Sequence, residues 1–548
     1  MPHLLVVSVI YFGVADLLAR ILICRGNPGR SGWDRVAGWF IVYGGALAAA
    51  ALVTGGVGAT QVVVAGLGVV TAVAGRATIR HLHLAGYLSV ATTAQFRIAA
   101  VGWLVHFAVT VESGPVVTAL LVVLAGTAVL VLPILLVDNF LLQEAAGWRN
   151  RAPGDPGHPP PARAPRVSVQ VPCYAEPPEV MKGTLDALAR LDYDNYEVVV
   201  IDNNTRDEAL WRPVQEHCRR IGDHFRFFHV DRLDGAKAGA LNFATARLTD
   251  DVELIAVVDA DYQAEPGYLK DLVGGFADPR LAFIQTSHDY RDFGDSAYQR
   301  GCYWEYRASY GGYMRSRSLR GTALLTGTMC VLRRRALDEV GGWAQWCCTE
   351  DSELSVRLHA AGYTGRYLHR AYGRGLIPQE YAGYKKQRYR WIYGPTQEFR
   401  RHWRLFLPTR WATPSALRPS QKFLFAHHGV REFAVAGASL VTTGAAVGLC
   451  VMLALGAVVG AVPAAVVAGL AAGAASASLT LWPLFRRYTW SRRRPAGRTS
   501  GRQSATCSGP GWSYGSVTPP TRSSRVRLRR TCQRRRRVAA SPPRACTS

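Results

Sequence analysis

Two aspartates one residue apart, Asp259 and Asp261, follow the apolar run 254–258. Carboxylates at this spacing can approach one hard cation together, and Mg²⁺ in proteins is usually held by one or two carboxylates plus the oxygens of a substrate phosphate. The pair alone is weak evidence, because exposed turns often contain Asp-x-Asp. It indicates a metal and phosphate site only if groups of matching chemistry join it.

A second acidic pair, Glu350 and Asp351, follows Thr349 and a Gly-Gly-Trp turn at 341–343. A carboxylate in a cleft can serve as the general base for a hydroxyl nucleophile. The structural alternative is that acidic residues near a helix start only interact favourably with the helix dipole. This pair therefore also needs support from its surroundings.

The third candidate group is Gln387-Arg388-Tyr389-Arg390-Trp391. Arginine can place two hydrogen bonds on phosphate oxygens, and tryptophan offers a flat face to a sugar ring. Two lysines, Lys385 and Lys386, precede the group. A basic amphipathic face lying against a membrane is the competing interpretation.

An α/β domain is the scaffold expected to position these groups, because residues 167–401 alternate β-branched runs with helical patterns. We expect strands at 167–171, 196–202, 225–230 and 253–259, and helices at 180–190 and 242–248. Such alternation predicts a mainly parallel sheet, and ligands of open parallel sheets bind beyond the carboxyl ends of the strands. Asp202 and Asp259 both fall at such ends.

Apolar residues make up 49% of the 548 residues and concentrate in two blocks, 1–141 and 430–485. A bilayer core needs about 20 apolar residues per helix. The pattern excludes a single soluble domain and predicts five membrane spans in the first block and two in the second. These spans are Leu4–Cys24, Val36–Thr54, Gly56–Gly75, Ile98–Val111, Val116–Val137, Phe433–Gly456 and Val458–Phe485.

The arginines of the short loops predict the orientation in the membrane. Arg25, Arg30, Arg35, Arg76, Arg80 and Arg97 would all fall on one side, which is the cytoplasmic side by the positive-inside rule. We therefore expect a multi-pass protein of the plasma membrane with residues 142–429 in the cytoplasm. In that part, 142–166 is a Pro-rich linker, 167–401 is the catalytic domain, and 402–429 lies on the inner membrane surface.

The net charge of +25 comes mostly from the end of the chain, since 17 arginines and no Lys, Asp or Glu occur in Arg486–Ser548. The other residues are only mildly basic, so a nucleic-acid partner is not predicted. Two hypotheses account for 486–548. It is a disordered basic tail on an anionic inner leaflet, or it is translated out of the ancestral frame beyond about residue 490. The coding DNA would distinguish them.

In order and spacing, residues 167–403 resemble the processive branch of the family 2 glycosyltransferases, the cellulose-synthase-like and hyaluronan-synthase-like membrane enzymes. The sequences of residues 373–376 and 384–387 resemble those of bacterial β-glucan synthases most closely. The matching pieces are Asp202, Gly235–Asn242, Asp259 with Asp261, Gly327-Thr328, Thr349-Glu350-Asp351 and Gln387-x-x-Arg390-Trp391.

The resemblance implies a GT-A-type, Rossmann-like catalytic domain inserted between transmembrane helical blocks. It implies that Asp351 is the general base and that Asp261, with Asp259, binds Mg²⁺ or Mn²⁺. It assigns substrate contacts to the remaining residues. Asp202 would contact the nucleotide base or ribose, and Lys237 would contact the diphosphate. Gln387 and Arg390 would support the leaving diphosphate, and Trp391 would stack on the acceptor sugar. Asp259 and Glu350 would also lie in the substrate site.

The expected reaction is inverting transfer of a sugar, with UDP-glucose as the first expected donor, to a growing β-linked polysaccharide. A positioned base activates the sugar hydroxyl, and a metal with arginine offsets the charge of the leaving diphosphate. Three alternatives remain open at this point. They are non-processive transfer of one sugar to a lipid acceptor, a basic membrane scaffold without catalysis, and a transporter. The sugar, linkage, acceptor and oligomeric state are not readable from the sequence.

Overall fold

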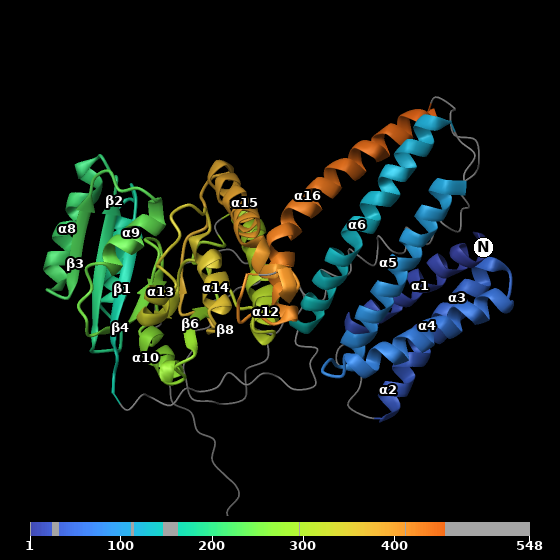
Figure 1. Ribbon diagram of the computed structural model, residues 1–548, viewed down its shortest axis with the longest axis horizontal. Coiled ribbons are helices and arrows are strands. Elements are labelled where there is room, and N and C mark those ends of the chain that lie inside the picture. The colour runs from blue at the N-terminus through green and yellow to red at the C-terminus, as the bar shows by residue number, and fades with distance from the viewer. Residues whose placement is uncertain are drawn as a thin grey trace, which may run out of the picture. The chain divides into compact units, whose positions relative to one another are not determined.

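The computed structural model describes residues 2–24, 32–110, 114–145, 163–294, 296–411 and 413–454. The expected last membrane span at 458–485, the tail at 486–548 and most of the linker at 142–166 lie outside these residues. The expectations for those segments therefore stay predictions. The other segments divide into a helical N-terminal part, an α/β domain and a long C-terminal helix (Figure 1).

Apolar helices make up the described N-terminal part. Five helical segments are long and apolar enough to cross a membrane, at His3–Leu22, Val36–Thr54, Ala59–Thr78, Leu84–Thr110 and Pro115–Glu144. Each of these helices overlaps one of the five spans expected in the first block, and the fourth is much longer than the expected 98–111. The helices are α1 (Pro2–Cys24), α2 (Gly32–Trp39), a π-helical turn at Phe40–Gly44, α3 (Gly45–Thr54), α4 (Ala59–Thr78), α5 (Leu84–Thr110) and α6 (Pro115–Ala145).

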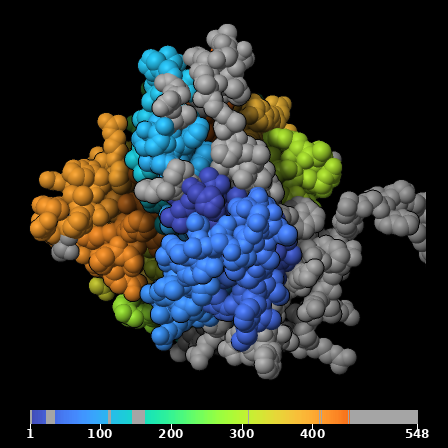
Figure 2. Space-filling view, turned by 90° about the vertical axis from the view of Figure 1, so that its right-hand side faces the viewer, coloured from blue at the N-terminus to red at the C-terminus, as the bar shows by residue number. Residues whose placement is uncertain are grey.

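The outer surface of these helices is apolar. Leu52 and Leu130 expose 86% and 77% of their surface, and many valines of α4 and α6 are also exposed. α1 packs against α3, α4 and α5, and α5 packs against α6, so that the N-terminal helices form one group in Figure 2. Exposed apolar surface on this scale is typical of helices that face lipid.

A seven-stranded sheet with the order β3-β2-β1-β4-β7-β6-β8 forms the centre of the α/β domain. Only β7 runs antiparallel to its neighbours, so the expected mainly parallel sheet is confirmed. The strands are β1 (Arg166–Cys173), β2 (Tyr196–Asn203), β3 (Phe225–Val230), β4 (Val252–Val257), β6 (Leu281–Thr286), β7 (Cys330–Arg333) and β8 (Thr364–Leu368). A small second sheet pairs β5 (Gln263–Ala264) with β9 (Gly373–Arg374).

Both faces of this sheet are buried, as the β-branched runs predict. Val198 and Val200 pack into the core on one face, whereas Val199 and Ile201 pack against α9 on the other. The helices and helical turns of the domain are α7 (Pro178–Leu188), α8 (Glu208–Ile221), α9 (Ala236–Thr245), α10 (Tyr268–Val273), Gly274–Ala277, α11 (Ala297–Ala308), Ser309–Tyr313, α12 (Met314–Leu319), α13 (Arg334–Glu339) and α14 (Glu350–Ala360).

The segment after β9 is more continuous than the sequence indicates. α15 (Tyr381–Phe406) crosses the expected boundary at residue 401 without a break. After a turn at Thr409–Trp411, α16 (Pro419–Ala454) runs from the expected interfacial segment into the sixth expected span. α15 packs against both α14 and α16 (Figure 1). A helix that carries candidate site residues therefore contacts a largely apolar helix directly.

Candidate active site

The two aspartates of the Asp-x-Asp pair lie just beyond the carboxyl end of β4, in a turn and not in the strand. β4 ends at Val257, and the backbone amide of Asp259 donates a hydrogen bond of 2.9 Å to Thr328 Oγ1. The Oδ2 atom of Asp261 accepts one of 2.8 Å from the backbone amide of Leu376. Burial, and then the charge of Asp259, raises the pKa of Asp261 to about 6.

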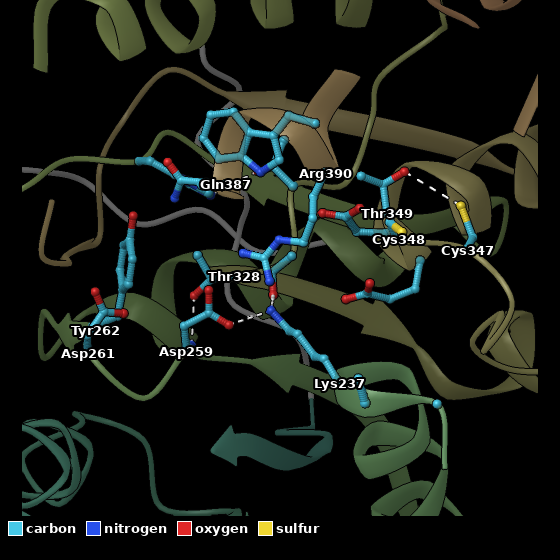
Figure 3. Close-up of a pocket in the computed structure, with 18 of the residues that line it drawn as sticks. Lys237, Asp259, Asp261, Tyr262, Thr328, Cys347, Cys348, Thr349, Gln387 and Arg390 are labelled. Atoms are coloured by element: carbon cyan, nitrogen blue, oxygen red, sulfur yellow. Dashed lines mark hydrogen bonds and ion pairs between the residues drawn. The ribbon is translucent and has the colours of Figure 1, made fainter. Parts of the chain in front are cut away.

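Lys237 lies opposite Asp259, at the start of α9. Its ammonium group forms an ion pair with Asp259 Oδ1 and donates a hydrogen bond of 2.8 Å to the carbonyl oxygen of Gly327 (Figure 3). Burial opposes the charge on Lys237, but Asp259 and Glu350 outweigh it and hold the lysine pKa above its ordinary value. The lysine is therefore a fixed positive charge among carboxylates.

Glu350 and Asp351 occupy the first turn of α14, where the helix dipole favours negative charge. The Oδ1 atom of Asp351 accepts a hydrogen bond of 2.7 Å from the backbone amide of Ser352. Burial, and then the neighbouring Asp351, raises the pKa of Glu350 to about 7, and burial also raises the pKa of Asp351. The pair can hold a proton near neutral pH, as a base that accepts one must.

A glycine lets the lysine and the Asp351 carboxylate approach the same stretch of backbone. Gly327 has a φ of +82°, and a Cβ atom there would lie 3.0 Å from Asp351 Oδ2 and 3.2 Å from Lys237 Nζ. A side chain at this position would strain the backbone and crowd both groups. The Gly-Thr pair at 327–328 thus forms the part of the cavity wall that lies between the two acidic pairs.

The third candidate group lies on α15. Gln387 Oε1 accepts a hydrogen bond of 2.7 Å from the hydroxyl of Tyr306. The ring of Trp391 lies 5.7 Å from that of Tyr306, and the guanidinium of Arg388 packs over Trp391 at 4.7 Å. Arg390, on the same helix, reaches toward Lys237 and Asp259 in Figure 3.

One cavity of about 570 Å³ brings most of these residues together. Of the residues expected in the site, its lining includes Lys237, Asp259, Asp261, Glu350, Asp351, Gln387, Arg390 and Trp391. Chemistry-bearing side chains that the sequence did not single out also line it, namely Tyr262, His288, Tyr290, Thr326, Gln345, Trp346, Cys347 and Cys348. The cavity combines several carboxylates, two cations and aromatic rings.

Asp202 is the exception among the expected site residues, because it does not line this cavity. It lies at the end of β2, buried, and its Oδ2 atom is 2.7 Å from His229 Nδ1. Its Oδ1 atom accepts a hydrogen bond of 2.6 Å from Thr205. Asp259, Asp261 and Asp351 therefore share this cavity, whereas Asp202 lies outside its lining.

Glu176 is an acidic residue near the site that the sequence analysis did not assign. It follows β1, in the Pro-Cys-Tyr-Ala-Glu turn. Burial, and then the charges of Asp261 and Asp259, raises its pKa to about 7. Its position after the first strand of a parallel sheet was the signal that could have identified it.

A divalent cation fits this donor set. Asp259 and Asp261 line the same cavity, and their mutual repulsion contributes to the raised pKa of Asp261, which a cation between them would relieve. No group of three or more His, Cys, Asp or Glu side chains arranged for a metal occurs among the described residues. Two carboxylates suffice for Mg²⁺ when substrate phosphate supplies further oxygens.

Residues 165–394 match the family model described as "Glycosyltransferase like family 2". Over 249 residues the chain is 32% identical to the cellulose synthase catalytic subunit [UDP-forming] of Pseudomonas fluorescens (strain SBW25), covering 44% of this chain and 32% of that protein. Over 252 residues it is 30% identical to the probable glucomannan 4-beta-mannosyltransferase 6 of Oryza sativa subsp. japonica, covering 44% of this chain and 43% of that protein. The chain thus spans less than half the length of these curated relatives.

Two solved structures resemble the chain at lower identity. The mannosyltransferase PcManGT from Pyrobaculum calidifontis, in complex with GDP-Man and Mn²⁺, aligns with a TM-score of 0.46 and 22% identity over 69% of this chain and 99% of that one. S. aureus TarS 1-349 in complex with UDP-GlcNAc aligns with a TM-score of 0.36 and 17% identity over 49% of this chain and 72% of that one.

The α/β domain is a glycosyltransferase family 2 domain, and the curated relatives that it resembles include a cellulose synthase subunit and a probable glucomannan mannosyltransferase. The family match confirms the expected class of enzyme, and together with the mainly parallel sheet it confirms the expected GT-A-type fold. The roles of the single residues in the cavity stay predictions, as do the domain boundaries.

Proposed function

We propose that the protein transfers a sugar from a nucleotide-sugar donor to a growing β-linked polysaccharide, with inversion at the sugar carbon. The observation that carries the proposal is the single cavity shared by Asp259, Asp261, Asp351 and the Gln387, Arg390 and Trp391 side chains. It combines a site for a charged diphosphate, a candidate base and an aromatic face for a sugar. A membrane scaffold without catalysis would have no use for this arrangement.

Cationic and amide groups of the cavity would hold the leaving diphosphate. Lys237 and Arg390 enter from opposite elements, α9 and α15, and each can donate hydrogen bonds to phosphate oxygens. Gln387 adds a neutral donor beside them. Fixed donors and charges directed at a group that gains negative charge stabilise the transition state more than the ground state.

Asp259 and Asp261 are the residues that would hold a divalent cation, Mg²⁺ or Mn²⁺. When bound, such a cation offsets the charge that develops on the departing nucleoside diphosphate. Glu176 lies close enough to raise the acidic charge of this end of the cavity further.

Asp351 would act as the general base for the acceptor hydroxyl. A sugar hydroxyl is a poor nucleophile at neutral pH, so its proton must pass to a positioned group as it attacks. The raised pKa of the Asp351 carboxyl strengthens it as a base. Direct attack by the hydroxyl on an α-linked donor gives a β-linkage in one displacement.

The acceptor side of the cavity supports a glycan. Trp391 lies in the cavity wall on α15, and contacts with Tyr306 and Arg388 fix the orientation of its ring for stacking on a sugar. α15 packs against α16, which reaches into the apolar C-terminal block. A polymer made here would lie beside the membrane segments, and a non-processive enzyme would not need this acceptor platform.

The donor that the relatives favour is a UDP-sugar, with UDP-glucose first, because one curated relative is a UDP-forming cellulose synthase. The other relative is named as a mannosyltransferase, so GDP-mannose belongs in the same test. Membranes containing the full chain are incubated with radiolabelled UDP-glucose, UDP-GlcNAc and GDP-mannose in turn, and any polymer is digested and methylated for linkage analysis. A long β-linked product supports the proposal. A single sugar on a lipid, or no transfer from any donor, contradicts it.

A further inference from the structure

A carboxylate that the proposed reaction does not use is buried between the two helices that carry the candidate base and the acceptor platform. Glu398 lies on α15 and exposes 2% of its surface. No Lys, Arg or His side chain of the described ranges forms an ion pair with it. Burying an acid without a cation is unfavourable unless its oxygens accept hydrogen bonds. The partners of this carboxylate therefore indicate what it does.

Two hydroxyl groups at the start of α14 donate hydrogen bonds to the carboxylate of Glu398. Its Oε1 atom accepts a hydrogen bond of 2.7 Å from Thr349 Oγ1 and a second from Ser352 Oγ. Thr349 is the residue before the first turn of α14, where threonine usually caps the helix with its own hydroxyl. That capping bond is not formed, because the hydroxyl is turned toward Glu398 instead.

The same two residues flank the candidate base on either side. Asp351 lies between Thr349 and Ser352, and its Oδ1 atom accepts the backbone amide hydrogen bond of Ser352. A shift of Thr349 or Ser352 would thus move the base. Glu398 holds both residues from α15, the same helix that presents Gln387, Arg390 and Trp391 to the cavity at positions nearer its N-terminus.

The backbone of α15 lies close enough to α14 for this contact because residue 394 is glycine. A Cβ atom at Gly394 would lie 2.0 Å from Thr349 Oγ1, nearer than atoms can approach. Gly394, Pro395 and Glu398 are the buried residues of α15, so they form the face that meets the neighbouring elements.

A second link between the same helices has a different chemistry. Glu353 Oε1 lies 2.8 Å from His402 Nε2, and Glu353 also forms an ion pair of 2.7 Å with Arg357. This link joins α14 to α15 through a carboxylate and an imidazole, one helical turn after Thr349. Breaking this link shows how the loss of a contact between α14 and α15 affects stability and turnover when the contact does not involve Thr349 or Ser352.

We propose that Glu398 is a positioning residue for sugar transfer, which fixes the first turn of α14, and with it Asp351, relative to the phosphate and acceptor groups of α15. The inference rests on the proposed function. Misplacement of a reacting group by about 1 Å can cost roughly 10²-fold in rate. Loss of Glu398 should therefore act on turnover more than on binding of the donor.

The chemistry of Glu398 defines a conservative variant. Burial raises its pKa to about 8, against the opposing effect of the hydrogen bonds from Ser352 and Thr349. Glutamine has the same shape as the neutral carboxyl group and keeps one oxygen that accepts both hydroxyl hydrogen bonds. Methionine has a similar length but no strong acceptor, so it removes the hydrogen bonds without leaving a large cavity.

The test compares Glu398→Met, Glu398→Gln and Thr349→Val in the full chain, with kcat and the donor KM measured per folded molecule. We expect Glu398→Met and Thr349→Val each to lower kcat about 10-fold or more while the donor KM changes less than about 3-fold. The double variant should be no worse than the more damaging single one, since both changes delete the same bond. Glu398→Gln should keep kcat within about 3-fold.

His402→Leu is the matched control, because leucine cannot donate a hydrogen bond to Glu353 and so breaks the other link between the helices. It should lower thermal stability and leave kcat unchanged. Unchanged kcat in both Glu398→Met and Thr349→Val would overturn the positioning role, as would a loss in Glu398→Gln equal to that in Glu398→Met. If Glu398→Met does not fold, Thr349→Val decides alone. An inactive wild-type protein would instead refute the proposed function, and this inference with it.

Discussion

The ammonium group of Lys237 forms an ion pair with Asp259 and lies close enough to Asp351 and Glu350 to oppose the rise that burial causes in the pKa of both. The lysine is thus a partly buried cation that balances two acidic pairs from different parts of the chain, one after β4 and one at the start of α14. Each pair would be more costly to bury without it. Its removal should change both donor binding and the titration of the base.

Lys237→Met is expected to raise the donor KM and to move the acid limb of the kcat profile to higher pH. The lysine charge favours the ionised form of Asp351, so its loss raises the pKa of the base, and more base is protonated at a given pH. The measurement is kcat and KM across the pH range with the expected donor. Lys182→Met, which breaks an outer pair with Glu179 on α7, should leave both profiles unchanged. A shift of the acid limb to lower pH would contradict the expectation.

Asp351→Asn should abolish transfer while donor binding stays within about 3-fold of wild type, since general base catalysis contributes roughly 10²- to 10⁴-fold. The amide keeps the shape of the side chain but cannot accept the proton. Donor affinity is measured by calorimetry and turnover by label incorporation. Asp338→Asn, on α13 and half exposed, is the matched control. Normal turnover in Asp351→Asn would remove the assignment of this residue as the base.

Asp261→Ala should abolish the metal requirement together with activity. The residue would be a ligand of the cation, and its carboxylate is anchored by the backbone amide of Leu376. Binding of Mn²⁺ in the presence of the nucleotide is measured by electron paramagnetic resonance, which does not depend on turnover. Asp194→Ala, exposed after α7, serves as the control. Metal-dependent turnover that survives in Asp261→Ala would place the ligand elsewhere.

The sheet and most of the cavity were predictable because their determinants are local. The β-branched runs mark β1 to β4 to within about two residues, and Asp259 and Asp261 follow the carboxyl end of a parallel strand, where ligands are expected. The resemblance to a known family supplied the expected role of Lys237, which spacing alone does not give. The strands that complete the sheet, β6 to β8, were not predicted, because their pairing spans long loops.

Other features depended on side-chain geometry that a sequence does not show. Asp202 lies at the end of β2 and Asp259 just beyond β4, yet Asp202 bonds to His229 and Thr205 and does not line the cavity. Glu398 resembles any surface acid of an amphipathic helix until α14 is packed onto it. The sequence pattern of α15 predicts its site residues but not the face that Gly394 brings against Thr349.

The stability of the protein should fall as the pH rises from about 4.3 to about 8, in part through Glu398. Its pKa is raised to about 8 in the folded protein, by burial first, with Asp351 and Glu353 adding to the effect. The folded form therefore binds the proton more tightly than the unfolded form, and this stabilisation is lost as the carboxyl ionises. Glu398→Gln removes the titration. Its melting temperature should therefore exceed that of wild type by more at about pH 8.5 than at about pH 5. Glu216→Gln, on the exposed side of α8, should have the same melting temperature as wild type at both pH values. If the difference in melting temperature between Glu398→Gln and wild type instead becomes smaller as the pH rises, the expectation is contradicted.

Gly394→Ala should separate α15 from α14 and lower both stability and turnover. The added methyl group would lie 2.0 Å from Thr349 Oγ1, so the helices must move apart or the threonine must leave Glu398. Overpacking of this kind costs about 1–3 kcal/mol. Gly383→Ala on the same helix is the matched control, because its methyl group would meet Pro378 Cβ at an ordinary 3.4 Å. Thermal unfolding and kcat are measured for both variants, and since alanine favours helix over glycine, Gly383→Ala should be as stable as wild type or more so. Equal behaviour of the two variants would mean that the close contact between α15 and Thr349 does not support the site.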